Sequence, residues 1–418
     1  TGIPGPARAM KRVYVNRRGR PRSIPERYFV RVDALRKTGL GYQAVVSISC
    51  DRMACLVGIS GEICHPCYKR GCTRKRAVQR NIGSKSRCVT LIKVLNHNNF
   101  ENITSQWNQL IAQSLNPTIF LTSWWNQTWL KYFNDGSLIE IIEIYENEHL
   151  IGIAPLSIKD NTVKFIGDED LYDYRDFIVI EGKEELFFEQ LAKHLCFLPW
   201  KTIELNSIPA NSPTLDYLPS IFESEKNKVD LHTENSTPTL LLADNWDTYL
   251  SQLSKKNRHE LKRKMKRLES QTNYETHVCC GKEIHTSCLD NFFNLHKLSS
   301  EEKLNFWNVK REKFFKSISQ QLISQEMLVL HSLILNGKSV AAAFIIKANQ
   351  SFLLYNSGFD PSFSQYSVGV LNTAFAIKNA IECEQKEFNF LKGKEPYKYR
   401  LGAQDIDIFS ITITKPTL

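Results

Sequence analysis

The order of apolar segments between residues 327 and 393 constrains the fold of this 418-residue chain more than any other feature. Three strand-like segments follow one another and are joined by short turns, at 327–337, 338–349 and 350–360. A loop, an apolar helical segment at 371–383 and a further strand at 387–393 come next. Short turns join antiparallel strands, whereas a helix between two strands is a crossover connection. The order therefore predicts a mixed α/β sheet.

The segment FNFLKGKEPYKYRLG, residues 388–402, ends this series with ionisable side chains. It begins as an apolar strand and breaks at Gly393, after which Glu395, Tyr397 and Lys398 follow within five residues. Enzymes with α/β sheets place their chemistry at the carboxyl ends of such strands. We therefore expect a catalytic role for at least one of these three side chains.

The preceding part of the chain has a similar composition of elements. An amphipathic helix at 99–114 precedes consecutive strands within 138–167, a helix at 184–195 and a strand at 201–209. A strand and a helix restart the pattern after residue 235. We therefore predict two α/β (α+β) domains, 89–235 and 236–418, and the second contains a basic helix at 254–270.

The first 88 residues differ sharply in charge from the remainder. They hold 20 Lys+Arg against 4 Asp+Glu, a net charge of +16, whereas residues 89–418 have a net charge of −6. A strongly basic segment is typical of nucleic-acid binding, so nucleic acid is an expected partner of residues 11–87. We see no apolar run of about 18 residues and no secretory signal, which predicts a cytoplasmic chain without a membrane partner.

Part of this basic segment resembles the first two helices of helix-turn-helix modules in resolvases and transposon regulators. The matching words are GRPRSIPERYF (19–29) and LRKTGLGYQAV (35–45). The resemblance ends before a third helix, and a stretch with six of the eleven cysteines follows. One CxxC, Cys64 to Cys67, has no second pair, so we assign no metal site. A zinc site, a poorly ordered segment and a non-native extension remain alternative interpretations of residues 50–88.

Residues from about 95 to 415 resemble a family of GNAT-type acyltransferases, the cellulose-biosynthesis (CelD/BcsL-like) acetyltransferases, which are relatives of the FemAB peptidyl transferases. The matching words are IGIAPL (151–156), DYRDF (173–177), KKNRHELKRKMKRLE (255–269), YNSGFDPSF (355–363), SVGVL (367–371) and FNFLKGKEPYKYRLG (388–402). The resemblance implies a tandem GNAT-like acyl-CoA N-acyltransferase fold, preceded here by a small basic helical segment. It also implies acetyl-CoA or another acyl-CoA as the donor.

The donor's phosphates need a site, and a helix N-terminus provides free backbone N–H groups. Gln365, Ser367 and Gly369 precede or begin the helical segment at 371–383 and are our candidates. The GNAT fingerprint Arg/Gln-x-x-Gly-x-Gly/Ala would place the glycine one residue nearer to Gln365. An ordinary serine-capped helix start is the alternative. Arg258 in the basic helix is a further candidate for phosphate contact, and a solvated helix face is the alternative there.

Two further side chains are candidates for proton transfer. Asp176 lies with Asp173 and Tyr174 at a strand start, and neighbouring carboxylates can raise one pKa towards that of a base. Asp176 could equally cap a backbone segment or pair with Arg175. Tyr355 ends a strand and could protonate a departing thiolate, although a tyrosine in a strand is more often packed.

Together these features predict transfer of an acyl group from acyl-CoA to an amine or hydroxyl of a small molecule, sugar or polysaccharide precursor. A FemAB-type transferase that uses aminoacyl-tRNA is an alternative, which the basic helix favours. A protein of another class, binding DNA through the helix-turn-helix-like segment, is a second alternative.

Overall fold

A computed structural model describes residues 29–38, 41–49, 92–97, 100, 103–168, 170–271 and 273–416. The chain divides into two units, Thr1–Ser86 and Arg87–Leu418. In the described part of the first unit, β1 (Phe29–Thr38) and β2 (Gly41–Ser49) pair as an antiparallel hairpin.

The hairpin occupies the place of the two helices that the helix-turn-helix resemblance predicted, so the basic helical segment is a wrong expectation over these residues. Val30, Val32 and Ala34 alternate with charged residues at the period of two that strands require, and β-branched residues favour strands. Residues 50–88 lie outside the described residues, as does the zinc-site alternative. Most of the segment expected to bind nucleic acid also lies outside them.

The first half of the second unit is an eight-stranded sheet in the order β3-β4-β5-β6-β8-β16-β9, with β7 paired to β5. Its strands are β3 (Ile92–His97), β4 (Leu138–Glu146), β5 (His149–Lys159), β6 (Thr162–Phe165), β7 (Ile178–Val179), β8 (Thr202–Pro209), β9 (Lys228–Ser236) and β16 (Asp407–Thr414). Its helices are α1 (Thr104–Ala112), η1 (Ile119–Leu121), α2 (Ser123–Phe133), α3 (Glu184–Leu195) and α4 (Thr214–Ser224). Helices α3 and α4 pack one face of the sheet, and α1 packs the other.

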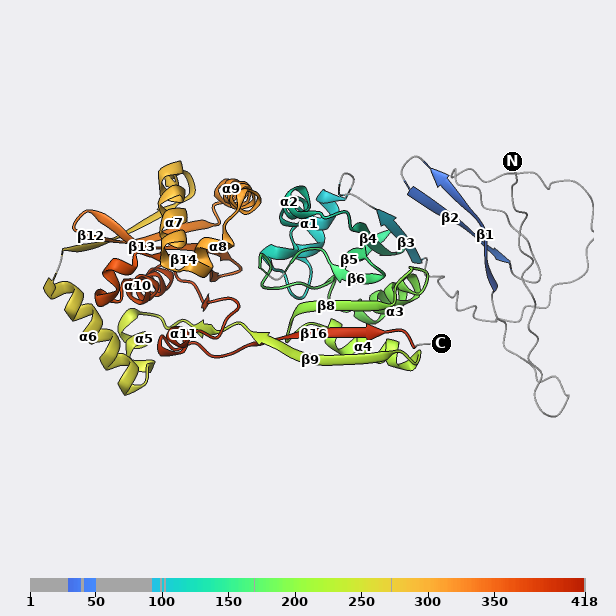
Figure 1. Ribbon diagram of the computed structural model, residues 1–418. Helices are drawn as coiled ribbons and strands as arrows, with labels where there is room; N and C mark the ends of the chain where they lie inside the picture. Colours follow the sequence, from blue (N-terminus) through green and yellow to red (C-terminus); the bar gives the residue numbers. More distant parts are fainter. Residues whose placement is uncertain are drawn as a thin grey trace, which may run out of the picture. The chain divides into compact units, whose positions relative to one another are not determined.

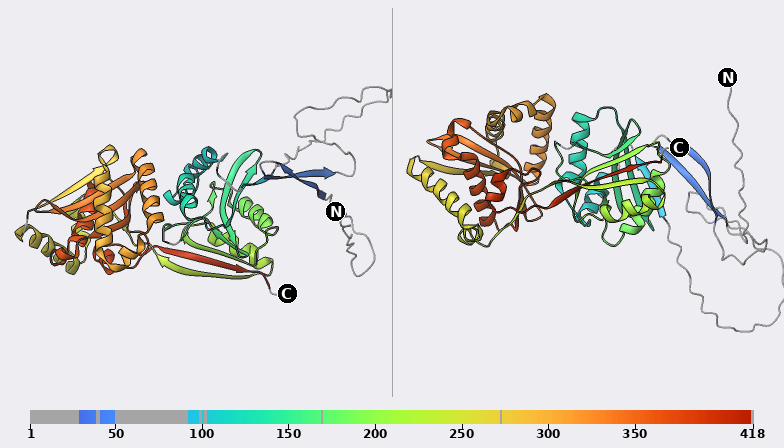
Figure 2. Two further views of the ribbon diagram at one scale, coloured as in Figure 1. Left: turned by 45° about the horizontal axis from the view of Figure 1, so that its top comes forward. Right: turned by 60° about the horizontal axis from the view of Figure 1, so that its bottom comes forward.

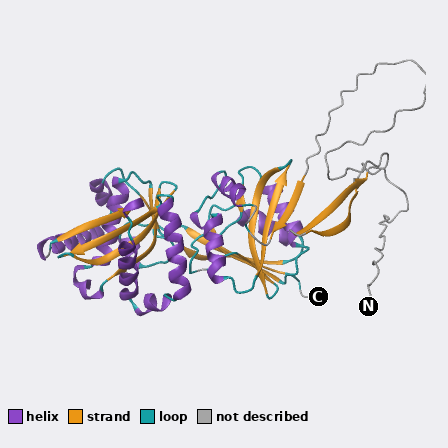
Figure 3. Ribbon diagram, turned by 90° about the horizontal axis from the view of Figure 1, so that it is seen from above, coloured by secondary structure: helices purple, strands orange, loops and turns teal. Residues whose placement is uncertain are grey.

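The second half is a six-stranded sheet in the order β10-β15-β14-β13-β12-β11 (Figure 1). Its strands are β10 (Thr239–Leu241), β11 (Tyr274–Cys280), β12 (Leu328–Leu335), β13 (Lys338–Ala348), β14 (Ser351–Phe359) and β15 (Glu387–Asn389). Its helices are α5 (Trp246–Gln252), α6 (Lys255–Gln271), η2 (Gly281–Glu283), α7 (Thr286–Ser299), α8 (Glu301–Phe306), α9 (Val309–Ser324), η3 (Pro361–Tyr366), α10 (Val368–Glu382) and α11 (Pro396–Arg400). Helices cover both faces of this sheet (Figure 3). Helix α10 lies with α5 and α6 on one face, and α7 lies with α9 on the other.

The two halves repeat one order of elements. In the first, β4, β5 and β6 pair antiparallel, α3 crosses over, and β8 pairs parallel with β6. In the second, β12, β13 and β14 pair antiparallel, α10 crosses over, and β15 pairs parallel with β14. The expected tandem GNAT-like α/β fold is therefore confirmed.

The last strand of the chain belongs to the first sheet. β16 lies between β8 and β9 and pairs antiparallel with both (Figure 2). Strands β3 to β9 thus belong to the first sheet and β10 to β15 to the second. β16 is the exception to a division near residue 235, because it follows the second sheet in sequence but pairs in the first. No helix among the described residues is both long and apolar enough to cross a bilayer.

Candidate active site in the second half

The strands β14 and β15 part in the middle of the second sheet. They pair parallel from Ser351 and Glu387 to Leu353 and Asn389, and no further. β14 continues to Phe359, and its register with β13 shifts so that Tyr355 is an extra residue between two paired neighbours. Such a bulge leaves backbone groups outside the ladder and redirects side chains. Beyond Leu353, the β14 backbone therefore has no strand partner on the β15 side.

A buried lysine holds the chain that turns away from β15. Lys398 Nζ donates to the carbonyl oxygens of Phe390, Leu391, Lys392 and Gly393 at 2.9–3.3 Å. It also pairs with Glu395 at 3.0 Å. Burial lowers the pKa of Lys398, and Glu395 opposes that shift. Because its three N–H groups are shared among these carbonyls and Glu395, Lys398 organises the turn rather than facing the space between the strands.

One of the predicted residues, Tyr397, faces β14 across that space, whereas Glu395 lies on the preceding turn and pairs with Lys398. Tyr397 hydrogen-bonds Ser357 of β14, and burial raises its pKa well above the ordinary tyrosine range, as does the Glu395 carboxylate. Lys303 of α8 donates to the Ser357 carbonyl oxygen. Burial lowers the pKa of Lys303, while Glu395 raises it. A phenol and a lysine therefore meet at Ser357 in the C-terminal part of β14, and the Glu395 carboxylate shifts the pKa of both.

The sequence did not single out Lys303, because α8 is a short helix whose charges resemble those of any exposed helix. It also missed His296 of α7. Trp307 Nε1 donates to His296 Nδ1 at 2.9 Å, so the proton is on Nε2, which donates to Asn356 Oδ1 at 2.9 Å. Burial lowers the pKa of His296 to about 4, so the ring is neutral. His296 thereby orients the Asn356 amide beside the bulge.

Close packing places α7 on β14. A Cβ atom at Gly358 would lie 2.3 Å from the His296 backbone nitrogen, so only glycine allows this approach. No sequence motif marks this contact, although Gly358 is the one glycine within β14.

The other two predicted catalytic residues lie elsewhere. Tyr355 is buried among aromatic rings and its hydroxyl donates to Leu171 O at 3.2 Å, which joins the two halves. Asp176 accepts from Thr214 Oγ1 at 2.6 Å and from Phe177 N at 2.8 Å, both in the first half. Burial raises the pKa of Asp176 to about 6. The structure does not bring either side chain to Glu395 and Tyr397.

The predicted phosphate-binding residues gather at the start of α10. Ser367 precedes the helix with a left-handed backbone (φ 58°), and its Oγ accepts from Lys264 Nζ of α6 at 2.7 Å. Gly369 lies in the first turn, where a Cβ would approach Phe359 Cδ1 to 3.0 Å. Gln365 is exposed on η3. Arg258 instead donates to Ser251 O at 2.9 Å, so Lys264 is the cation that the basic helix brings here.

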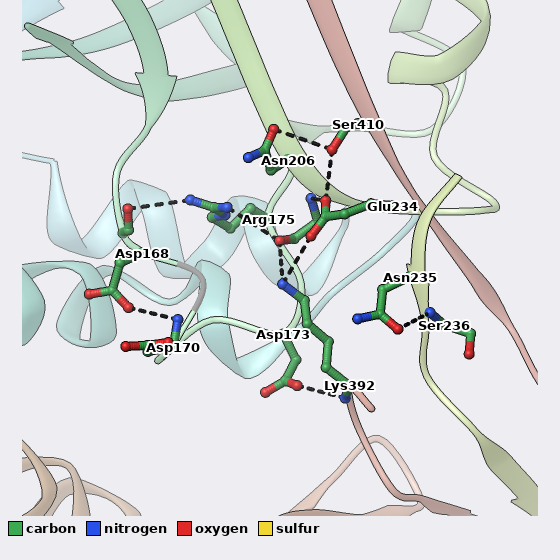
Figure 4. A network of polar contacts seen from close by, with 12 residues as sticks. Asp168, Asp170, Asp173, Arg175, Asn206, Glu234, Asn235, Ser236, Lys392 and Ser410 are labelled. Atoms are coloured by element: carbon green, nitrogen blue, oxygen red, sulfur yellow. Dashed lines mark hydrogen bonds and ion pairs between the residues drawn. The ribbon is translucent and has the colours of Figure 1, made fainter. Parts of the chain in front are cut away.

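The corresponding place in the first half is filled by side chains from both halves (Figure 4). Lys392 N donates to Asp173 at 2.7 Å, and Lys392 Nζ donates to Ser207 Oγ at 2.7 Å and to Glu234 at 3.3 Å. Arg175 N donates to Ser207 O at 2.9 Å. Although burial opposes it, Lys392 holds the pKa of Glu234 below its ordinary value. Burial raises the pKa of Asp173 despite the bond from Lys392.

Comparisons with known proteins identify a domain family and a similar fold. The acetyltransferase (GNAT) domain family matches residues 255–399. The crystal structure of FemX superposes with a TM-score of 0.53 at 12% identity, covering 73% of this chain and 95% of FemX. A protein of unknown function from Bacteroides thetaiotaomicron gives 0.48 at 13% identity, with 75% and 97% covered.

A tandem GNAT protein from the clavulanic acid biosynthesis pathway gives a TM-score of 0.46 at 11% identity, covering 78% of this chain and 100% of that protein. No curated protein matches the sequence. Residues 255–399, which include the parting strands, Lys264 and the start of α10, thus carry a GNAT acetyltransferase domain within a tandem GNAT-like fold.

Proposed function

We propose that the chain moves an acetyl or other acyl group from acyl-CoA to an amine or hydroxyl of a small molecule, sugar or polysaccharide precursor. The observation that carries the proposal is the parting of β14 and β15 beside a bulge, with the start of α10 after the same strand. Backbone N–H groups that are not used in a sheet can bind the oxygen of a carbonyl under attack.

The residues at the start of α10 fit a phosphate-bearing donor. Lys264 supplies a positive charge at Ser367, and the first turn of the helix supplies backbone N–H groups. Helix α6 carries eight basic and two acidic side chains, which favour a polyanion along this edge. When bound, the donor supplies a thioester carbonyl. The equivalent helix of the first half, α3, begins with Glu184 and Glu185, which repel phosphate.

We assign acid–base roles to Tyr397 and Glu395. Tyr397 keeps its proton at neutral pH, as any tyrosine does, and its place beside Ser357 of β14 makes it the candidate proton donor to a departing thiolate. Glu395 has an exposed carboxylate and is the candidate base for the acceptor. Lys398 holds the turn that positions both.

The acceptor would approach through a cleft of about 560 Å³ that both halves line. Asn116, Thr118 and Asn211 come from the first half, and Ser351, Leu353 and Asn389 from the second. Thr118 Oγ1 is buried without a hydrogen-bond partner among the described residues, so a ligand hydroxyl or amide could satisfy it. Leu353 and Asn389 are also the last paired residues before the strands part, so the cleft reaches the point where the strands part.

The runner-up is a FemAB-type transferase that uses aminoacyl-tRNA. The cationic α6 favours it, because a helix with a large excess of positive charge attracts nucleic-acid phosphates. Extraction of nucleic acid from the purified full chain tests the aminoacyl-tRNA alternative directly.

Calorimetric titration of the full chain with acetyl-CoA tests the main proposal. We expect the parent to bind and Gly369→Trp to lose binding, because position 369 faces Phe359 with no room to spare. Lys378→Trp, on the exposed part of the same helix, is the matched control and should bind like the parent. Failure of a folded parent to bind acetyl-CoA would overturn the acyl-CoA proposal and make tRNA the next ligand to test.

A further inference from the structure

Two thiols lie close together outside the candidate active site. Cys279, near the end of the edge strand β11, and Cys288, in the first turn of α7, have Sγ atoms 3.3 Å apart. A disulfide bond is about 2.05 Å long, so these sulfurs need to approach by only roughly 1.3 Å to bond. The pair joins two elements that are separated by a short connection.

The pairing is specific to one of two adjacent cysteines. Successive side chains of a strand point to opposite faces, so Cys279 faces α7 and is buried, whereas Cys280 is exposed. His277 lies on the same face as Cys279, and its Nδ1 is 3.6 Å from Cys279 Sγ. The local order His277, Cys279, Cys288 therefore places an imidazole, a buried thiol and a partly exposed thiol in one row.

We infer that Cys279 and Cys288 are a reversible oxidation site that reacts with a hydroperoxide and closes to an intramolecular disulfide. The partly exposed Cys288 meets the oxidant first. Burial raises the pKa of Cys279 to about 12, and Cys288 adds to that shift, so Cys279 acts second. The inference uses none of the residues of the proposed acyl transfer and stands independently of it.

The chemistry balances in two steps. The Cys288 thiol attacks the peroxide O–O bond, becomes a sulfenic acid and releases one alcohol or water that carries away the thiol proton. Cys279 sulfur then attacks Cys288 Sγ, the S–O bond breaks, and the leaving hydroxide takes the Cys279 proton as water. His277 Nδ1 is placed to relay that proton. Two thiols are oxidised, and one hydroperoxide is reduced.

The bond would tie the edge strand to the start of α7. The same helix carries His296, which packs on Gly358 and orients Asn356. Oxidation therefore fixes the N-terminal end of the helix that covers β14.

Peptide mapping of the full-length protein tests the inference. Trypsin cleaves after Lys282 and separates Cys279 and Cys280, in peptide 268–282, from Cys288, in peptide 283–297. The native protein is treated with hydrogen peroxide and free thiols are blocked before digestion. The linked peptide pair is then measured in the parent and in Cys279→Ser, Cys280→Ser and Cys288→Ser.

We expect the linked pair in the parent and in Cys280→Ser, at a yield roughly tenfold above that in Cys279→Ser. The reason is that the fold keeps the Cys279 and Cys288 sulfur atoms close together, which gives them a high effective concentration. Cys288→Ser should give none, and dithiothreitol should separate the pair. Circular dichroism confirms that each variant is folded. Absence of the pair in both the parent and Cys280→Ser would overturn the inference, as would an undiminished yield in Cys279→Ser.

Discussion

Lys264 Nζ of α6 donates to Ser367 Oγ at 2.7 Å, and Ser367 is the residue that precedes α10. The contact spans 103 residues of sequence. The contact brings one lysine of the strongly basic α6 to the N-terminus of α10, where anions are stabilised.

Lys264→Ala should weaken acetyl-CoA binding about tenfold, because a charge-assisted hydrogen bond to phosphate is lost. Calorimetry measures the dissociation constant of each variant. Lys262→Ala removes an exposed charge from the same helix and should bind nearly as the parent does. An equal loss in both variants would mean that α6 attracts the donor only through its overall charge.

Tyr397→Phe should lower the turnover of acetyl-CoA by about 100-fold and leave its dissociation constant unchanged, because the phenol donates a proton only during reaction. Turnover is followed as release of free thiol. Tyr399→Phe on the same helix removes a phenol that instead bonds Asp405 at 2.8 Å, and it serves as the control. A Tyr397→Phe variant with parental turnover would exclude the acid role.

His331 should make stability depend on pH. It is buried, its Nδ1 bonds Asn372 Oδ1 at 2.9 Å, and burial lowers its pKa to about 4. The unfolded state, with a histidine pKa near 6.5, binds the proton first on acidification. The stabilisation is thus complete above about pH 6.5 and declines, by up to about 3 kcal/mol, as pH falls towards 4.

Urea unfolding at pH 7 and pH 4.5 measures this loss. His331→Gln should show a smaller decrease between the two pH values than the parent. Asp176 contributes with the opposite sign, because its raised pKa of about 6 makes the folded state hold a proton longer, so its contribution is lost as pH rises from about 4 to 6. An unchanged decrease in His331→Gln would assign the acid sensitivity to other groups, such as His296.

Lys392→Met should lower the free energy of unfolding by about 3 kcal/mol, because it leaves the half-buried Glu234 carboxylate without its cation. The double variant Lys392→Met/Glu234→Gln should recover part of that loss, since no charge is then left unpaired. Chemical denaturation of the three proteins measures the coupling. Additive losses would show that the bond at 3.3 Å contributes nothing to joining the halves.

The candidate site was predictable in part. Glu395 and Tyr397 were expected because they follow a strand and a glycine within a few residues. The structure places Tyr397 at Ser357 of β14 and Glu395 on the turn that Lys398 holds. Their catalytic roles stay predictions. Lys303 and His296 lie on helices that are distant in sequence from Glu395 and Tyr397. The amphipathic pattern of these helices predicts which side chains are buried, but not which residues they contact.

Two other predicted catalytic residues lie outside the candidate site. Asp176 and Tyr355 have residue types that suit catalysis, but the structure gives them Thr214 and Leu171 as partners and buries both. A sequence shows that a carboxyl or phenol exists, whereas its hydrogen bonds depend on which segments pack against it.

Local patterns by themselves determined the repeated order of strands and helices, because hydrophobic periodicity and turn residues act over a few neighbours. Only the tertiary structure decided where β16 pairs, which lysine of α6 reaches Ser367, and that Cys279 rather than Cys280 meets Cys288. The N-terminal hairpin differs from the resemblance to helix-turn-helix modules, which predicted helices over β1 and β2. The positions of β16, Lys264 and Cys279 depend on tertiary packing, in which burial of apolar faces selects among contacts that the sequence leaves equivalent.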